Sequence, residues 1–177
     1  MLESVTGVLL VGGASRRFGS PKSLARLEGE TLAERGWRAL AGCGERLAVG
    51  KLADGLALSF PVQDDGTEVR AALAGLVAGL RLARYELCVV LPVDCPLVTP
   101  ELLGELAEAC ADAAVPQTGP LPGAYRRSAL PILERRLAAG ELTLRDALDE
   151  LDTRRVNVAP ELLADVDTPD DLRRLSL

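Results

Sequence analysis

The sequence contains no histidine, few aromatic residues and no long hydrophobic run. Without histidine, a Ser-His or Cys-His nucleophile and a histidine general base are excluded. No apolar stretch approaches the roughly 20 residues that span a bilayer, and the first residues, MLESVTG, lack the basic start of a signal peptide. We therefore expect a cytoplasmic chain without a membrane partner, whose chemistry depends on carboxylates, cations or metal.

The four cysteines are far apart and form no C-x-x-C pair; they are Cys43, Cys88, Cys95 and Cys110. In a chain without histidine, this spacing argues against a zinc site and indicates buried free thiols. Cys95 is the one candidate for a chemical role, because it adjoins an aspartate, Asp94, at the end of an apolar run.

The chain is acidic, with a formal net charge of −6. A nucleic-acid surface needs a basic stripe, so we expect no nucleic-acid partner. The length of 177 residues fits one domain over residues 1–177. No repeat or linker-like run indicates a second domain.

Residues 7–27, GVLLVGGASRRFGSPKSLARL, join an apolar strand to a basic loop. The apolar run 5–11 is typical of a central parallel strand buried on both faces. Residues 12–22 hold three glycines, two serines, two arginines and a lysine, so backbone N–H groups and fixed cations can surround a triphosphate. Taken singly, each residue also fits a plain turn or a solvated face. Together they form a basic island in an acidic chain, which favours a small anion.

The rest of the chain alternates between helical and strand patterns, which is typical of an α/β fold. The patterns predict helices over 31–40, 69–80 and 99–110 and a further helix after Ser128, and strands at 45–49, 56–60, 86–92 and 113–116. The helix over 69–80 has the spacing of an amphipathic helix. Thr143 and Thr168 each precede an acidic residue at capping-box spacing.

Asp94 stands at the carboxyl end of the apolar strand 86–92. In open α/β sheets, ligands bind at this end of the strands. Thr99 and Pro100 then predict the start of a helix. Asp94 therefore stands where a ligand would bind, and the alternative is a capped turn.

The loop pattern L-x-G-G-x-S-x-R-x-G-x-x-K resembles the signature of nucleotidyltransferases with a GT-A-type fold. Its fixed positions are Leu10, Gly12, Gly13, Ser15, Arg17, Gly19 and Lys22. Within that superfamily, the double glycine is most similar to the molybdenum cofactor guanylyltransferases. The resemblance implies a Rossmann-like, three-layer α/β fold, with a mostly parallel central sheet and helices on both faces. It also implies transfer of a GMP moiety from GTP to the terminal phosphate of molybdopterin, with release of pyrophosphate.

The same resemblance implies roles for individual residues. The nucleotide-binding set is Leu10, Val11, Gly12, Gly13, Ser15, Lys22, Asp64, Asp65 and Asp94. Lys22 and Arg17 would neutralise the phosphates, and Asp94, with help from Asp167, would hold Mg²⁺. The residues Leu73–Gly75 match part of a helix start that borders the base pocket, so Asp64 or Asp65 would read the base. An Asp-Asp-Gly turn is the alternative for that pair.

The acceptor side has a second resemblance, in the stretch GPLPGAYRRS at 119–128. Tyr125 would offer a stacking ring and Arg126 a phosphate-binding fork. The alternative is a strand with one arginine paired to a neighbouring carboxylate. The C-terminal match, Asp165, Asp167 and residues 168–172, resembles the family's D-x-D-T-P-E-D-L ending, although a glycosyltransferase D-x-D or a strand end would also fit Asp165 and Asp167.

Two features depart from the guanylyltransferase pattern and leave the nucleobase open. Pro21 and the Asp165-x-Asp167 pair favour a CTP:molybdopterin cytidylyltransferase, whereas the double glycine disfavours it. A sugar-1-phosphate nucleotidylyltransferase and a non-catalytic nucleotide-binding module also remain open. The implied partners are GTP, molybdopterin, and proteins that deliver the cofactor or receive it as molybdoenzymes.

Overall fold

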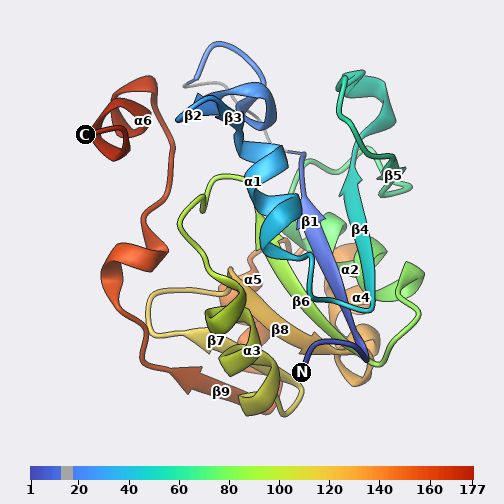
Figure 1. Cartoon of the computed structure of the whole chain (residues 1–177). Coiled ribbons are helices and arrows are strands. Elements are labelled where there is room, and N and C mark those ends of the chain that lie inside the picture. The colour runs from blue at the N-terminus through green and yellow to red at the C-terminus, as the bar shows by residue number, and fades with distance from the viewer. Residues whose placement is uncertain (13–17) are drawn as a thin grey trace.

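The computed structural model describes residues 1–12 and 18–177. Its main feature is a seven-stranded sheet in the order β5-β4-β1-β6-β8-β7-β9 (Figure 1). Within this seven-stranded sheet, β8 alone runs against its neighbours, β6 and β7, and the other described pairs are parallel. The predicted mostly parallel sheet is therefore confirmed.

The bounds of the elements follow the chain in order. The strands are β1 Val5–Leu10, β4 Glu45–Gly50, β5 Val62–Asp64, β6 Leu87–Pro92, β7 Ala113–Pro116, β8 Gly123–Arg126 and β9 Thr153–Val156. The helices are α1 Leu32–Ala39, α2 Ala72–Leu82, α3 Pro100–Ala109, α4 Leu130–Ala138, α5 Leu144–Leu148 and α6 Pro169–Leu175. Short 3₁₀ helices are η1 Lys22–Leu24, η2 Leu52–Asp54, η3 Arg127–Ala129 and η4 Pro160–Leu163, and a separate hairpin pairs β2 Arg26–Leu27 with β3 Glu30–Thr31.

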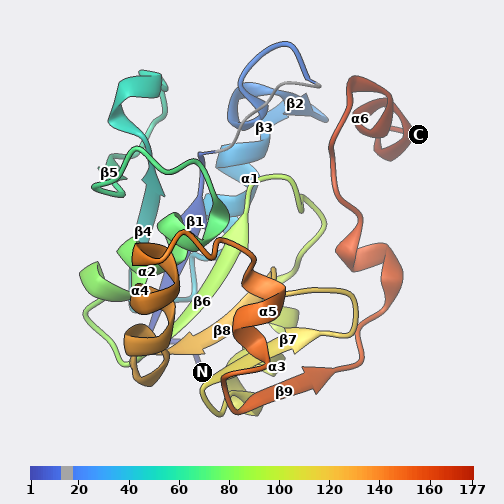
Figure 2. The same cartoon turned by 180° about the vertical axis from the view of Figure 1, so that it is seen from behind.

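Helices cover both faces of the sheet. Helices α1 and α3 lie on the face toward the viewer in Figure 1, and α2, α4 and α5 lie on the opposite face, which Figure 2 shows. In β1, Leu9 packs into the core on the α1 side, whereas Val8 and Leu10 pack into the core on the α2 side. Central strands buried on both faces have continuous apolar runs for this reason. The predicted three-layer arrangement is confirmed.

Helix α2 lies close to β1 because it carries glycine where the two elements touch. A Cβ at Gly79 would lie 2.8 Å from Val8 Cγ1, and one at Gly75 would lie 2.9 Å from Leu10 Cδ2. The helix also packs against α4, so residues 73–80 are all buried. The predicted amphipathic helix over 69–80 is therefore wrong in character, since it has no broad polar face, and wrong at its start, which is Ala72.

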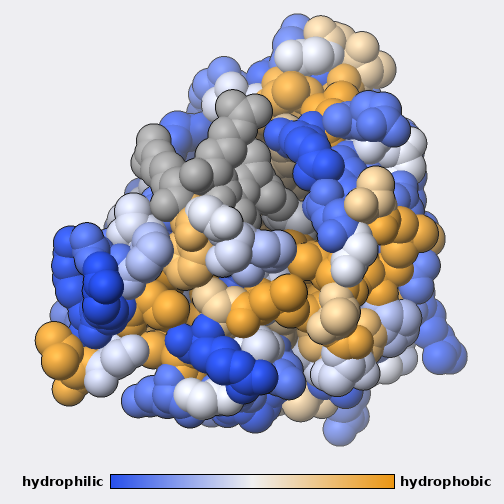
Figure 3. All heavy atoms as spheres, turned by 90° about the horizontal axis from the view of Figure 1, so that it is seen from above, coloured by the Kyte–Doolittle hydropathy of each residue, from blue (hydrophilic) through white to orange (hydrophobic). Residues whose placement is uncertain are grey.

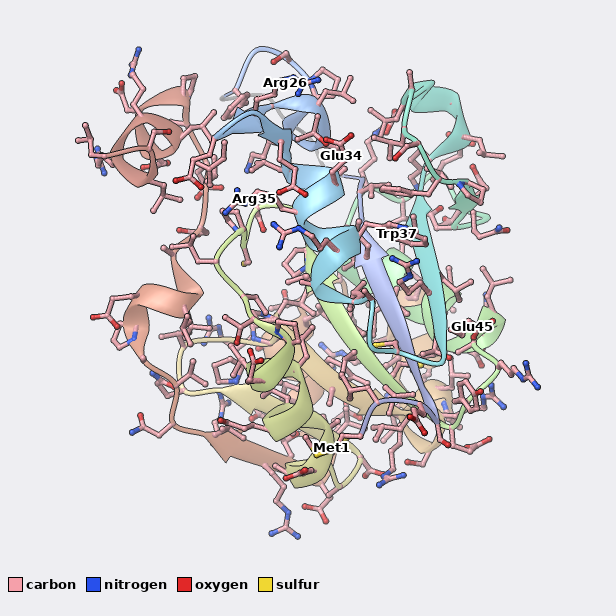
Figure 4. All side chains as sticks on the ribbon, in the orientation of Figure 1. Met1, Arg26, Glu34, Arg35, Trp37 and Glu45 are labelled. Carbon is pink, nitrogen blue, oxygen red and sulfur yellow. The ribbon has the colours of Figure 1, made fainter. Side chains whose placement is uncertain are left out.

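The predicted strand at 56–60 does not exist. Residues 55–58 are irregular and the edge strand is β5, further along the chain. The apolar residues of this segment pack through their side chains instead: Phe60 stacks on Trp37 with ring centroids 4.2 Å apart. Trp37 is on α1 (Figure 4), and the guanidinium of Arg46, on β4, covers its ring at 4.4 Å from the ring centroid. The apolar residues at 56–60 therefore resembled a strand in sequence, although this segment pairs with no strand of the sheet.

The predicted helix starts have mixed outcomes. Thr99 and Thr168 cap α3 and α6 as predicted, and Thr168 forms a full capping box with Asp171. Thr143 makes no side-chain cap hydrogen bond, so the predicted capping box there is wrong. Of the helices that the structure describes, none is both long enough and apolar enough to cross a membrane.

The close approach of α2 to β1 can be tested with two glycine substitutions of opposite expected sign. Gly79→Ala is expected to lower the free energy of unfolding by about 1–2 kcal/mol, because Val8 is β-branched and cannot move aside easily. Gly104→Ala in α3, where an added Cβ meets no atom within 4 Å, is expected to raise it by about 0.5–1 kcal/mol through helix propensity. Urea unfolding measures both, and a stabilising Gly79→Ala would contradict the packing described.

Candidate active site

A cavity of about 700 Å³ opens at the carboxyl edge of the parallel strands. Leu10 and Gly12 border it at the end of β1, Gly50 at the end of β4, and Pro92 at the end of β6. Its other walls are the start of α2, the loop 118–121, and the segment 160–165. This edge is at the top of Figure 1, and Figure 3 views it from above, where hydrophilic and hydrophobic residues both reach the surface.

Beside this cavity, Lys22 brings together two carboxylates from distant parts of the chain. Its Nζ lies 2.9 Å from Asp167 Oδ1 and 3.7 Å from Asp94 Oδ2. Lys22 begins η1, Asp94 follows β6, and Asp167 precedes α6. The fold thus places three of the predicted site residues next to one another.

Lys22 is positioned by the serine that follows it. Ser23 Oγ donates a hydrogen bond of 2.8 Å to the carbonyl oxygen of Val11, and this bond is buried. This hydrogen bond connects η1 to the end of β1. Val11, a predicted nucleotide-binding residue, therefore helps to position Lys22 through its backbone carbonyl oxygen. Nothing in the local sequence pattern indicated this role of Ser23.

Hydrogen bonds hold the backbone of Asp94 and that of Asp167 in place. Val166 N donates to the carbonyl oxygen of Asp94 at 2.8 Å, and the Val166 side chain is fully buried. Asp167 N donates to Asp171 Oδ2 at 3.0 Å, next to the capping box of α6. The C-terminal segment is therefore fixed to the end of β6 and delivers Asp167 to the site.

Negative charge is concentrated around Asp94. Burial raises the pKa of this carboxyl above its ordinary value, the Lys22 ammonium lowers it, and Asp167 and Asp165 raise it further. Asp165 also lines the cavity. Within the described residues, no group of three or more metal-ligating side chains could enclose an ion. The carboxylate donors of Asp94 and Asp167 instead suit an ion such as Mg²⁺, which takes one or two protein carboxylates and completes its shell with water and substrate phosphates.

Cys95 does not have the environment of a nucleophile. Its Sγ lies 3.7 Å from Asp94 Oδ1, and the residue is buried. Burial, and then the neighbouring Asp94 carboxylate, raise the pKa of the thiol far above its ordinary range. The thiol is therefore neutral at physiological pH, and only a thiolate is an effective nucleophile.

Of the two candidate base readers, only Asp65 lines the cavity. Asp64 is exposed and accepts backbone hydrogen bonds from Leu52 N at 2.8 Å and Gly66 N at 2.7 Å, which lower its pKa. Asp64 therefore lies outside the cavity lining, and its contacts are those of the Asp-Asp-Gly turn, the alternative for this pair.

The predicted acceptor residues Tyr125 and Arg126 do not lie at the site. Tyr125 is fully buried and its hydroxyl donates to Pro120 O at 2.6 Å, so its ring offers no face to a ligand. Arg126 pairs with Leu87 at the opposite edge of the sheet, because β8 runs antiparallel to β6. The alternative, a strand with an arginine paired to a carboxylate, is correct for Arg127, which lies 3.0 Å from Glu86.

The remaining loop predictions have different outcomes. Leu10 and Gly12 line the cavity. Gly13, Ser15 and Arg17 lie outside the residues that the structure describes.

The structure also brings three basic residues to the cavity that the sequence motifs did not indicate, Lys51, Arg70 and Arg145. Lys51 could have been suspected, because it is one of two lysines in the chain and follows a predicted strand. Arg145 carried no such signal. It lies on α5, and its Nη2 donates to Thr118 O at 3.1 Å, a contact between segments distant in sequence.

The chain is similar to known proteins in both sequence and structure. Residues 7–156 match the family described as MobA-like NTP transferase domain. A probable molybdenum cofactor guanylyltransferase from Chloroflexus aggregans is 35% identical over 96% of this chain and 92% of its own length, and one from Deinococcus radiodurans is 32% identical over 97% and 94%.

Solved structures agree in fold. Molybdopterin-guanine dinucleotide biosynthesis protein A from Archaeoglobus fulgidus superposes with a TM-score of 0.84 and 28% identity, covering 97% of this chain and 96% of that one. The 2-C-methyl-D-erythritol 4-phosphate cytidylyltransferase from Thermus thermophilus, at 18% identity, shares the fold with a TM-score of 0.74 and coverage of 96% of both chains.

The neutral state of Cys95 can be tested by thiol alkylation. At about pH 8, near the ordinary pKa of a free thiol, iodoacetamide is expected to leave Cys95 unmodified in the folded chain, because the thiolate is scarce and buried. In urea, all four cysteines are expected to react. Peptide mass mapping reads out each site, and rapid alkylation of Cys95 in the folded chain would contradict the environment described.

Proposed function

Because the chain belongs to the family of MobA-like NTP transferases, we propose that it transfers the GMP moiety of GTP to the terminal phosphate of molybdopterin and releases pyrophosphate. The observation that carries this proposal is the contact of Lys22 with Asp94 and Asp167, beside a cavity that both Asp94 and Asp65 line. Similarity to molybdenum cofactor guanylyltransferases along nearly the whole chain supports it.

The reaction needs positioning and neutralisation of charge more than proton transfer. An oxygen of the acceptor phosphate forms a bond to the α-phosphorus of GTP, and the bond from that phosphorus to the bridging oxygen of the β-phosphate breaks. A phosphomonoester, whose second pKa is about 6, is mostly ionised at neutral pH, so no general base is required. A chain without histidine suits this chemistry.

Each residue of the site has a part in this proposal. Lys22 neutralises the phosphates at the reacting centre. Asp94 and Asp167 hold Mg²⁺, which supplies further positive charge at the phosphates when bound. The hydrogen bond from Val166 N to Asp94 O sets the geometry at the end of β6, so the carboxylates keep their places as the substrates bind.

Asp65 favours guanine over cytosine. Its Oδ2 accepts no hydrogen bond from the described residues, whereas Oδ1 accepts from Lys51 and from Thr67 N. An ionised carboxylate only accepts hydrogen bonds, and guanine presents two N–H donors on its pairing edge. Cytosine presents an acceptor nitrogen there, which a carboxylate repels. The open Oδ2 of Asp65 therefore supports GTP over CTP as the substrate.

The acceptor binds on the other side of Asp94 in this proposal. The sheet order places β5 and β4, and with them Asp65, on one side of β6, and the loop 118–121 after β7 on the other. Arg145, on α5 (Figure 2), lines that second side and has no carboxylate ion-pair partner within the described residues. We assign to Arg145 the binding of the acceptor phosphate, the role that the sequence pattern predicted for Arg126.

The choice of nucleotide and metal is tested by identifying the product. Incubation with molybdopterin and Mg²⁺ is expected to yield the guanine dinucleotide from GTP at least about tenfold faster than the cytosine dinucleotide from CTP, since one charge-assisted hydrogen bond distinguishes the bases. EDTA is expected to stop the reaction. Asp94→Asn is expected to reduce the rate about 10²–10³-fold, whereas Asp149→Asn, at an exposed position away from the cavity, serves as the matched control.

Two results would contradict this assignment. Product from CTP alone would favour the cytidylyltransferase alternative. Tight binding of GTP without any product would favour a non-catalytic nucleotide-binding module.

The role of Arg145 is tested by the KM of each substrate. Arg145→Ala is expected to raise the KM for molybdopterin about tenfold or more, because a charge-assisted hydrogen bond to phosphate is lost, with little change in the KM for GTP. Arg154→Ala, which removes an exposed arginine on β9, is the control. An equal rise in both KM values for Arg145→Ala would show that this arginine does not discriminate the acceptor.

A further inference from the structure

The wall of the cavity next to Asp65 contains a lysine that the proposed reaction does not use. Lys51 follows β4 directly, and its Nζ lies 2.7 Å from Asp65 Oδ1. The side chains of Lys51 and Asp65 are 11% and 6% exposed. Charges this far removed from water are stable only when they are well paired and hydrogen-bonded, so the two residues depend on each other.

All three N–H donors of the Lys51 ammonium group are used in hydrogen bonds to residues 65–69. Besides Asp65 Oδ1, its Nζ donates to Val69 O at 2.7 Å and to Thr67 O. An ammonium group has three N–H donors, so none is left for a phosphate of the nucleotide. Lys51 therefore fixes residues 65–69 to the end of β4, together with the hydrogen bond of 2.9 Å from Asp65 N to Gly50 O.

The Lys51–Asp65 ion pair occupies Oδ1 of the aspartate and leaves its Oδ2 open to a ligand. Asp65 Oδ1 accepts from both Lys51 Nζ and Thr67 N, at 2.7 and 3.1 Å. Its Oδ2 has no partner among the described residues, and Asp65 lines the cavity. An ionised acceptor with one open oxygen selects a base that offers N–H groups there, and rejects a base that offers an acceptor.

We infer that Lys51 is a positioning residue that sets the base selectivity of the site, by holding Asp65 Oδ1 so that Oδ2 stays open to the base. This inference rests on the proposed function, since it takes a nucleoside triphosphate as the ligand. Without the ammonium, Asp65 Oδ1 loses one of its two donors, and the carboxylate can turn away from the base. A carboxylate that has turned away neither accepts from the N–H groups of guanine nor repels the acceptor nitrogen N1 of adenine, so the two bases bind more equally.

The test compares the affinities for GTP and ATP, each with Mg²⁺, by titration calorimetry. Lys51→Met keeps the apolar stem of the side chain and removes its charge. It is expected to lower the GTP-to-ATP preference about 10- to 100-fold, the effect of losing one charge-assisted hydrogen bond. Arg70→Met is the matched control, because Arg70 also lines the cavity but pairs with Asp54 at 2.8 Å, and it is expected to keep the preference.

A double variant shows whether Lys51 acts through Asp65. Once Asp65→Asn has removed the carboxylate, adding Lys51→Met is expected to leave the GTP-to-ATP preference unchanged. This comparison does not require Lys51→Met alone to fold. It uses Asp65→Asn, in which the Lys51 ammonium still donates to the carbonyl oxygens of Thr67 and Val69, and the double variant, which contains neither charge. A further change in preference on adding Lys51→Met to Asp65→Asn would overturn the inference.

The two ways of failing are distinguishable. A wild-type chain that binds neither triphosphate would contradict the proposed function, and this inference with it. A wild-type chain that prefers GTP, combined with a folded Lys51→Met variant that keeps the same preference, would contradict only the role of Lys51.

Discussion

The contact of one ammonium group with two carboxylates is the interaction on which this site depends. Lys22 follows β1, Asp94 follows β6 and Asp167 precedes α6, so the site exists only when the central strands pair and the C-terminal segment returns to them. Lys22 is 18% exposed, Asp94 31% and Asp167 48%. Ion pairs with this much solvent contribute little stability. Their importance is the fixed charge that they present to a phosphate.

The sequence predicted the centre of the fold better than its margins. Residues 5–11 and 86–92 are mostly apolar, interrupted only by Thr6, Gly7 and Glu86, because β1 and β6 are buried on both faces, and such short, nearly continuous apolar runs are typical of central parallel strands. The predictions of a strand at 56–60 and of an amphipathic α2 were wrong. Phe60 is buried by stacking on Trp37, and α2 is buried on all sides by its neighbours. Apolar periodicity records that side chains are buried, but it does not show whether Phe60 meets a neighbouring strand or the ring of Trp37.

The site predictions divide in the same way. Lys22 and Asp94 could be located because a strand end and its loop are close in sequence. Arg126 was misplaced because local pattern does not give strand direction, and an antiparallel β8 sends this residue to the far edge of the sheet. The hydrogen bonds of Lys51 reach residues up to 18 positions away. Such contacts follow from the path of the whole chain and not from a motif.

In the proposed reaction, the α-phosphorus of GTP passes to molybdopterin at this edge of the sheet. GTP that carries a phosphorus label at either the α- or the γ-position tests this transfer most directly. The proposed reaction requires the α-label to enter the molybdopterin dinucleotide in the wild type and the γ-label to leave in pyrophosphate. Appearance of the γ-label on molybdopterin, or release of the α-label only as free GMP, would contradict it.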